Sequence, residues 1–317
     1  MQRGELRAVD GLSYHVNKGE CVALVGESAC GKSVSALSVM RLIPYPPGII
    51  VGGEIIFKGK DILKVSEAEM RHIRGNEIAM VFQEPTTSLN PTLNIKRQVS
   101  ETIKLHRRLN DRETAEEAVK LLTLVGIPDP EKRISDYPHQ FSGGMQQRIM
   151  IAMALSCNPA LLIADEPTTA VDVTVQAQLM EVLNNLRNQF GTSLIIITHN
   201  LGVVARYADK VEVMYAGRLV ESGPTNVIYR HPRHPYTIGL IASVPRLDLP
   251  RKHGLKAIRG LPPNLTALPR NICPFVVRCD YAVQKCHEQR PELEEIDQDH
   301  VAACFRSHEL PQIAKVS

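Results

Sequence analysis

Apolar residues along the chain fall into two recurring patterns. Short apolar runs have the length of buried β-strands, and they lie at residues 20–25, 53–58, 77–82, 160–164 and 193–197. Apolar positions with helical spacing occupy residues 98–108, 113–125, 142–157 and 174–189. Because strands that alternate with helices build parallel sheets, the pattern predicts an α/β domain with a mostly parallel core sheet and helices on its faces.

Prolines become frequent toward the C-terminus and interrupt this alternation. Between Gly223 and Pro269 they recur every few residues, which is typical of an extended or loop-rich segment. We therefore place a domain boundary near residue 230. The prediction is one domain over residues 1–230 and an extension over residues 231–317.

Composition excludes several classes of protein. Apolar residues make up 44% and charged residues 22%, the balance of a soluble globular protein. The net charge of +3 is too small for a nucleic-acid binder. The longest apolar runs fall well short of the ~20 residues that span a bilayer, and the first residues lack the features of a secretory signal. We expect a cytoplasmic protein whose membrane role would come through a partner.

The strongest local motif is GESACGKS at residues 26–33, which fits the phosphate-loop pattern G-x-x-x-x-G-K-[ST]. A predicted strand precedes it and a helical stretch follows. Glycines let the backbone curl so that its N–H groups face phosphate oxygens, and the helix N-terminus adds a positive dipole end. Lys32 would contact the phosphates and Ser33 would ligate Mg²⁺. The loop residues are Gly26, Glu27, Ser28, Ala29, Cys30, Gly31, Lys32 and Ser33.

A second motif is a strand that ends in two carboxylates, LLIADEP at residues 161–167. The carboxyl end of a strand is where open α/β sheets bind ligands. Adjacent carboxylates repel each other unless a cation lies between them or their roles differ. Asp165 suits the Mg²⁺ shell, whereas Glu166 suits polarising an attacking water. Alone, such a strand end is commonly structural, but the phosphate loop upstream favours the functional interpretation.

Two further motifs add anion-binding groups. In FSGGMQQR, residues 141–148, Ser142 and two glycines open a helix without a strand leading into it. A second phosphate-binding helix terminus suggests the γ-phosphate of another subunit's nucleotide. His199 follows an apolar strand in ITHN and could donate to a γ-phosphate oxygen, although a single histidine at a strand end is more often structural.

The ordered set GESACGKS, VFQEP, FSGGMQQR, LLIADEP and ITHN resembles the ATP-binding cassette family over residues 8–224. The resemblance implies a phosphate-loop nucleotide-binding domain with an inserted helical subdomain around residues 90–150. It implies ATP and Mg²⁺ as ligands and ATP hydrolysis as the reaction. Glu166 resembles the catalytic base, His199 the switch histidine, and Gln83 the residue that contacts Mg²⁺ and water. Asp172 resembles an acidic residue of the loop linking two sites. The signature that clamps the opposite subunit's ATP corresponds to Ser142, Gly143, Gly144, Met145 and Gln146.

Longer stretches resemble the ATPases of oligopeptide and dipeptide importers. They are EPTTSLNPTLNI (84–95), FSGGMQQRIMIAMAL (141–155), HPRHPYTIGLIASVPRLD (231–248) and GLPPNL (260–265). This resemblance implies a second, different ATPase as partner, two membrane permeases and an external binding protein, with the chain peripheral on the cytoplasmic face of the bacterial inner membrane. Nickel importers share the layout. A soluble cassette protein of translation or DNA repair is a rival hypothesis, as is a degenerate subunit that hydrolyses ATP poorly.

Four of the seven cysteines lie in the extension, at Cys273, Cys279, Cys286 and Cys304. Their spacing is not that of a zinc ribbon, yet four thiolates can hold Zn²⁺ or an iron–sulfur cluster. Importers of the resembled group carry a 4Fe–4S cluster on a similar set, so a 4Fe–4S cluster is the first choice. Four unligated thiols are the alternative.

Three departures from the family pattern concern the nucleotide. Ala29-Cys30 replaces the usual Gly-Ser of the loop, and we expect binding to survive because both are small. Cys30 lies beside Lys32, a setting that predicts a reactive thiolate. Val171 replaces the usual Leu, a mild change. The family's adenine-stacking aromatic lies upstream of where this sequence starts, and Tyr14 is expected to pack against the core instead.

Overall fold

The structure is a computed structural model that describes residues 5–167, 173–244 and 258–310. The chain divides into two compact units. The first comprises residues 1–15, 22–35 and 198–317, and the second comprises residues 16–21 and 36–197. No helix among the described residues is both long and apolar enough to cross a membrane.

The second unit contains a parallel sheet in the order β4-β5-β6. Its strands are β4 (Ile78–Val81), β5 (Leu161–Asp165) and β6 (Ser193–Thr198). The register pairs Ile78 with Leu161 and Leu161 with Ser193, so the strands run side by side from the same level. Their continuous apolar sequences suit burial on both faces. The carboxyl ends of all three strands therefore lie at one edge, with Asp165 at the end of β5.

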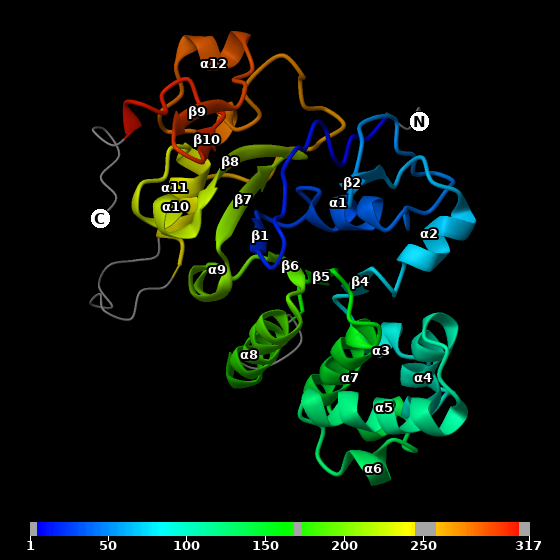
Figure 1. Ribbon diagram of the computed structural model, residues 1–317. Helices are drawn as coiled ribbons and strands as arrows, with labels where there is room; N and C mark the ends of the chain where they lie inside the picture. Colours follow the sequence, from blue (N-terminus) through cyan, green and yellow to red (C-terminus); the bar gives the residue numbers. More distant parts are fainter. Residues whose placement is uncertain (1–4, 168–172, 245–257, 311–317) are drawn as a thin grey trace. The chain divides into compact units, whose positions relative to one another are not determined.

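Helices of the second unit gather into the subdomain that the sequence predicts around residues 90–150 (Figure 1). The elements are α3 (Pro85–Ser88), α4 (Ile95–His106), α5 (Asp111–Leu124), α6 (Pro130–Arg133), η1 (Pro138–Gln140) and α7 (Gly143–Leu155). Asparagine and serine side chains cap the longer helices, because their oxygens accept backbone N–H groups of the first turn: Asn94 on α4, Asn110 on α5 and Ser142 on α7. Outside this group lie α2 (Glu67–Ile73) and α8 (Val173–Phe190).

In the first unit the strand order is β1-β7-β8-β10-β9. The strands are β1 (Cys21–Val25), β7 (Lys210–Tyr215), β8 (Arg218–Pro224), β9 (Glu294–Asp297) and β10 (His300–Ala302). β1 pairs with β7 in parallel, whereas β7, β8, β10 and β9 pair antiparallel. The parallel part was predicted. The antiparallel part adds two strands of the extension to the same sheet.

Short helices of the first unit flank this sheet (Figure 1). They are α9 (Leu201–Tyr207), α10 (Thr225–Arg230), α11 (Pro235–Ala242), η2 (Val276–Arg278) and α12 (Gln284–Glu288). A single apolar core joins β-strand residues such as Val213 and Tyr215 with Tyr236, Phe275 and Val276. Extension residues thus complete a core that begins in β1 and β7. α1 (Lys32–Val39) starts at the end of the predicted phosphate loop.

One predicted strand is much shorter than expected. Residues 53–58 form only β2 (Ile56–Phe57), which pairs with β3 (Lys60–Asp61) in a two-stranded hairpin. Lys58 and Gly59 both have positive φ angles, the geometry of the tight turns that close two-residue hairpin loops. Ile56 is 56% exposed. The apolar run therefore has no buried face to extend it, which is why hydrophobicity alone misjudged its length.

Candidate functional site

The predicted phosphate loop is curled tightly after β1. A Cβ atom at Gly26 would lie 2.3 Å from the carbonyl oxygen of Met214, and one at Gly31 would lie 2.2 Å from the carbonyl oxygen of Ala8. Side chains cannot be accommodated at such distances, so both glycines are needed for the backbone to pack. Cys30 accepts a backbone hydrogen bond from Gly217 at 3.0 Å, which anchors the loop to the turn between β7 and β8.

Lys32 is buried inside the curl of this loop. Its Nζ donates to the carbonyl oxygens of Gly26 at 2.7 Å and Glu27 at 2.9 Å, and lies 3.7 Å from the Cys30 Sγ. The ammonium therefore faces the loop's own backbone, in the place where a phosphate-loop lysine meets phosphate oxygens. Contact between Lys32 and phosphate oxygens stays a prediction of the motif.

Ala29 and Cys30, the two loop residues that depart from the family pattern, differ from the usual pair in backbone strain and in side-chain chemistry. Ala29 has φ of +62°, a left-handed conformation that costs a non-glycine residue about 1–2 kcal/mol. Cys30 is buried, and burial raises the pKa of its thiol although Lys32 opposes the shift. The prediction of a reactive thiolate at Cys30 is therefore wrong, because loss of hydration outweighs the nearby ammonium.

A set of residues that no sequence motif indicates holds the loop from outside. Arg278 donates to both carboxylate oxygens of Glu27, at 2.6 and 2.9 Å. Tyr236 accepts the backbone N–H of Glu27 through its hydroxyl oxygen at 2.7 Å. These residues lie 251 and 209 positions from Glu27. The available signals were HPYT and the arginine beside Cys279, but neither indicates its distant partner.

In the second unit, the end of β5 carries the predicted carboxylate pair. Asp165 is buried, and Glu166 has φ of +44°. The N–H of Glu166 donates to the carbonyl oxygen of Ile197 at 2.8 Å, which fixes this strained residue against β6. Gln83 donates from Nε2 to the Glu166 Oε2 at 2.9 Å. The structure thus brings together Gln83 and Glu166, which come from separate motifs 83 positions apart.

The glycine pair of the predicted signature begins α7. The Ser142 hydroxyl caps this helix by accepting the N–H of Met145 at 3.4 Å, and Gly143 is the first residue of the helix. Gln146 is buried, and its amide donates to the carbonyl oxygens of Pro138 and Phe141 at 2.9 and 3.1 Å. Gln146 thus shapes the approach to the helix, while the exposed Gly143 presents the helix terminus.

His199 follows β6 and is exposed. The next residue, Asn200, donates its N–H to the Thr198 hydroxyl at 3.0 Å and caps α9 through its side chain. Asp172 lies outside the described residues. Tyr14 packs near Glu212, and burial together with that carboxylate raises the pKa of Tyr14 to about 12. Tyr14 is half-buried, as expected for a residue that packs against the core.

The four extension cysteines surround one cavity. It is lined by Cys273, Cys279, Cys286 and Cys304 together with His234, Phe275 and neighbouring residues. The N–H of Cys273 donates to the carbonyl oxygen of Cys286 at 3.0 Å. Burial, reinforced by the neighbouring thiols, raises the pKa of Cys273 and of Cys304 to about 12. Within the described ranges, however, no three His, Cys, Asp or Glu side chains are arranged to hold a metal ion.

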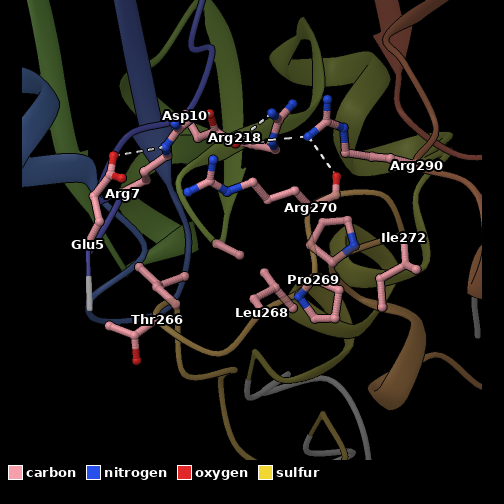
Figure 2. Close-up of a pocket in the computed structure, with 13 residues that line it drawn as sticks. Glu5, Arg7, Asp10, Arg218, Thr266, Leu268, Pro269, Arg270, Ile272 and Arg290 are labelled. Carbon is pink, nitrogen blue, oxygen red and sulfur yellow. Dashed lines mark hydrogen bonds and ion pairs between the residues drawn. The ribbon is translucent and has the colours of Figure 1, made fainter. Parts of the chain in front are cut away.

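A second cavity of about 70 Å³ lies between the N-terminal segment and the extension (Figure 2). Arg218 and Arg290 point toward Asp10, at 2.6 and 3.9 Å. None of the lining residues is aromatic. Its charged side chains mainly pair with one another, so the cavity works as a junction between chain segments. It offers no stacking surface for a base.

A glycine-rich loop between a core strand and a helix, with its lysine inside, defines a phosphate-loop nucleotide-binding protein. The carboxylate pair at the end of β5 fits the same class. The chain belongs to the ABC transporter family, whose model matches residues 9–169. A second family model, described as the oligopeptide/dipeptide transporter C-terminal region, matches residues 220–286.

Similar proteins with curated descriptions cover almost the whole chain. The oligopeptide transport ATP-binding protein OppD of Bacillus subtilis (strain 168) is 50% identical over 99% of this chain and 87% of its own length. The dipeptide transport ATP-binding protein DppD of the same organism is 47% identical over 99% of this chain and 93% of its own length. A solved dimeric ATP-binding cassette bound to ADP and Pi is 25% identical, with a TM-score of 0.64, over 71% of this chain and 94% of that chain. The protein is accordingly an ATPase of the cassette type.

Proposed function

We propose that this protein is the ATP-hydrolysing subunit that drives import of dipeptides or oligopeptides through a membrane transporter. The observation that carries the proposal is the match to peptide-transport ATPases over nearly the entire chain, extension included. A cassette alone would leave the cargo open, whereas the extension is described by a model of oligopeptide and dipeptide transporters. The net charge of +3 and the absence of a basic run speak against nucleic acid as a partner.

The ATP site is proposed to use the phosphate loop together with the polar residues of the later motifs. The phosphate loop would wrap the triphosphate, with Lys32 contacting its terminal phosphates. The oxygen donors that suit Mg²⁺ are Ser33, Gln83 and Asp165. The amide nitrogen of Gln83 is bonded to Glu166, so its oxygen remains to face a metal. Mg²⁺ would supply charge neutralisation at the phosphates.

Hydrolysis is assigned to the carboxylate of Glu166. A carboxylate placed within reach of water can orient it and accept its proton. Gln83 restrains that carboxylate through the 2.9 Å hydrogen bond, which limits the directions in which water can be held. His199, exposed after β6, would donate to the γ-phosphate.

The exposed start of α7 is proposed to act on a second subunit's nucleotide. Ser142, Gly143 and Gly144 would bind the γ-phosphate there, Met145 would flank it, and Gln146 would support them from below. Asp172 would connect the two ATP sites. A heterodimer with a related ATPase, two membrane permeases and an external binding protein complete the proposed assembly. The chain would then lie on the cytoplasmic face of the inner membrane as a peripheral subunit.

The cysteine cavity is proposed as the site of a metal centre. Four thiols lining a single cavity supply the donor set of a 4Fe–4S cluster or of Zn²⁺. The raised pKa values of Cys273 and Cys304 mean that bare thiols stay protonated, so a metal would have to displace protons to bind. Four thiols have the chemistry of such a donor set, although no three side chains of the described residues are arranged to hold a metal ion as they stand. The role we propose for such a centre is structural.

The test is growth of the source strain, with this gene deleted, on a medium in which a peptide supplies an essential amino acid. The wild-type gene should restore growth, whereas Glu166→Gln should not. In purified protein the same change should keep ATP binding while hydrolysis falls by about 10²–10⁴, which is typical of losing a general base. Equal protein levels in the two strains and growth on the free amino acid are the controls.

Restoration of peptide-dependent growth by Glu166→Gln would contradict the assignment of Glu166. Normal peptide use by the deletion strain, combined with a loss of nickel uptake, would instead identify the nickel-importer alternative. Weak hydrolysis by the wild-type protein in the assembled transporter would identify a degenerate subunit.

A further inference from the structure

The extension reaches the phosphate loop through one arginine. We propose that Arg278 is a positioning residue for nucleotide binding: it neutralises Glu27 and holds that residue's carboxylate away from the phosphates. Arg278 donates from both terminal nitrogens to the two carboxylate oxygens, at 2.6 and 2.9 Å. This two-pronged geometry fixes direction as well as charge. The inference rests on the proposed function, namely that residues 26–33 bind the triphosphate.

Glu27 presents a problem that Arg278 solves. An acidic side chain in the second position of a phosphate loop would repel a triphosphate. Two hydrogen bonds between oppositely charged groups join Arg278 to the Glu27 carboxylate, which makes this a strong ion pair. The side chain of Arg278 is only 5% exposed and that of Glu27 is 25% exposed. Solvent therefore screens the pair only weakly, and its charges nearly cancel at the loop.

The arginine itself is held rigidly. Its Nε donates to the carbonyl oxygen of Arg259 at 2.8 Å, and its guanidinium lies 5.8 Å from the ring centres of Tyr215 and Phe275. These two rings pack on each other at 5.2 Å and on Tyr236 at 4.6 and 5.4 Å. An aromatic cluster formed by one residue of β7 and two residues of the extension thus fixes where the guanidinium points.

The same cluster also determines the backbone at Glu27. Its N–H donates to the hydroxyl of Tyr236, which is fully buried. That N–H is therefore engaged with the extension side of the loop. The other N–H groups of the loop would bind the phosphate oxygens. Glu27 would contribute by fixing the path of the loop backbone through its bonds to Tyr236 and Arg278. Both polar groups of one loop residue are thus tied to Tyr236 and Arg278.

A double-mutant cycle tests this proposal by measuring ATP affinity of the purified full chain. Arg278→Met leaves the Glu27 charge uncompensated, and we expect ATP to bind about tenfold more weakly or worse. Glu27→Gln removes the charge that Arg278→Met leaves uncompensated, so the double variant Glu27→Gln/Arg278→Met should bind ATP about as tightly as Glu27→Gln alone. Arg270→Met removes an extension arginine for which no ion pair exists among the described residues, and it is the matched control.

A simple packing role for Arg278 would give a different pattern. The double variant would then be as weak as Arg278→Met alone, and this result would overturn the proposal. For ATP hydrolysis by Arg278→Met, kcat should change less than KM, because the variant loses affinity for ATP rather than a group that takes part in the reaction. The penalty of Arg278→Met should also be larger for ATP than for adenosine, which has no phosphates to repel.

A second variant covers the case in which Arg278→Met does not fold. Glu27→Asp keeps the charge but shortens the side chain, so it cannot reach both nitrogens of Arg278. We expect it to bind ATP more weakly than Glu27→Gln does, and equal affinities would overturn the proposal. Failure of the wild-type chain to bind ATP would count against the proposed function instead, so the two failures are distinguishable.

Discussion

His234 shows how a single residue supports the phosphate loop from a distance. Its Nδ1 accepts the N–H of Tyr236 at 3.0 Å and so caps α11, the helix that carries Tyr236. The imidazole is buried, and burial lowers the pKa of His234 from 6.5 to about 3. An unprotonated Nδ1 is needed to accept this hydrogen bond. The helix cap and the neutral histidine therefore require each other.

This lowered pKa predicts an acid-sensitive fold. Above pH 6.5 His234 is neutral in both folded and unfolded chains, so its contribution is fully present. As the pH falls from 6.5 toward 3, the unfolded chain binds a proton that the folded chain refuses, and stability is lost at up to about 1.4 kcal/mol per pH unit. His234→Asn keeps an oxygen acceptor without a titration, so its free energy of unfolding should fall less steeply between about pH 6.5 and 5.

Denaturant unfolding at several pH values measures this slope. His139→Asn is the control, because this histidine is exposed and should leave the slope unchanged. Parallel pH profiles for wild type and His234→Asn would show that His234 does not titrate as its burial implies.

At the scale of elements, the caps of α7 and α5 allow an effect on stability to be distinguished from an effect on function. Ser142 caps α7 with a long 3.4 Å hydrogen bond, whereas the Asn110 side chain caps α5 by accepting two 3.0 Å bonds. In return, the backbone N–H of Asn110 donates to the Glu113 carboxylate. Loss of an N-cap costs about 0.5–2 kcal/mol of stability. The weaker geometry places Ser142 at the low end of that range.

Ser142→Ala should therefore reduce ATP-driven subunit association and hydrolysis by much more than its effect on stability implies. The reason is that the same hydroxyl and helix terminus are proposed to bind the partner subunit's nucleotide. Asn110→Ala is the matched control, and it should cost at least as much stability while hydrolysis in the assembled transporter stays near wild type. ATPase rates and thermal unfolding measure the two quantities. Equal losses of activity in both variants would refute the assignment of Ser142.

Elements that bury apolar runs could be predicted from the sequence, and others could not. The runs that became β4, β5 and β6 lie inside the parallel sheet of the second unit, so their composition alone marks them. β9 carries the sequence EEID and is largely exposed at an edge, so hydrophobicity gives no indication of it. It exists because β10 pairs with β8, with Val301 opposite Ser222. Pairing partners of this kind are set by tertiary structure.

The site divides in the same way. Motifs such as residues 26–33 and 161–167 could be recognised because their chemistry is local: a curl of glycines, or carboxylates at a strand end. The Glu27–Arg278 pair could not, because it joins distant parts of the chain and neither residue belongs to a pattern that names the other. The reactivity of Cys30 was misjudged for a related reason, since burial depends on the whole fold.

At the scale of the whole molecule, the cysteine cavity and the phosphate loop are connected. Cys273 and Cys279 flank η2, which ends at Arg278, and Phe275 and Val276 line the cavity. A metal centre held by the four thiols would fix both ends of this segment. The position of Arg278, and with it the charge balance at Glu27, would then depend on the centre being intact.

Cys279→Ser should consequently lower both metal content and ATP affinity. Anaerobically purified wild-type protein should contain iron and show broad visible absorbance, and its metal affinity should rise with pH because thiols of raised pKa must lose protons. Elemental analysis and nucleotide titration measure the two effects. Cys157→Ser is the control, since this thiol belongs to the second unit, which contains no residue of the extension. Protein without any bound metal would refute the metal centre. Stoichiometric zinc would show that the centre is a zinc site and not an iron–sulfur cluster.

The contact between Glu27 and Arg278 has a consequence for how the protein is made. A ribosome adds about 5–20 residues per second, so the 251 positions that separate the pair take on the order of 10–50 s to synthesise. During this interval the nascent chain exposes the glycines and Lys32 of its loop beside an acid that has no counter-charge. A growing chain would therefore bind ATP weakly until Arg278 has emerged from the ribosome. Premature termination before residue 278 would yield fragments that contain every cassette motif but compete weakly for cellular ATP.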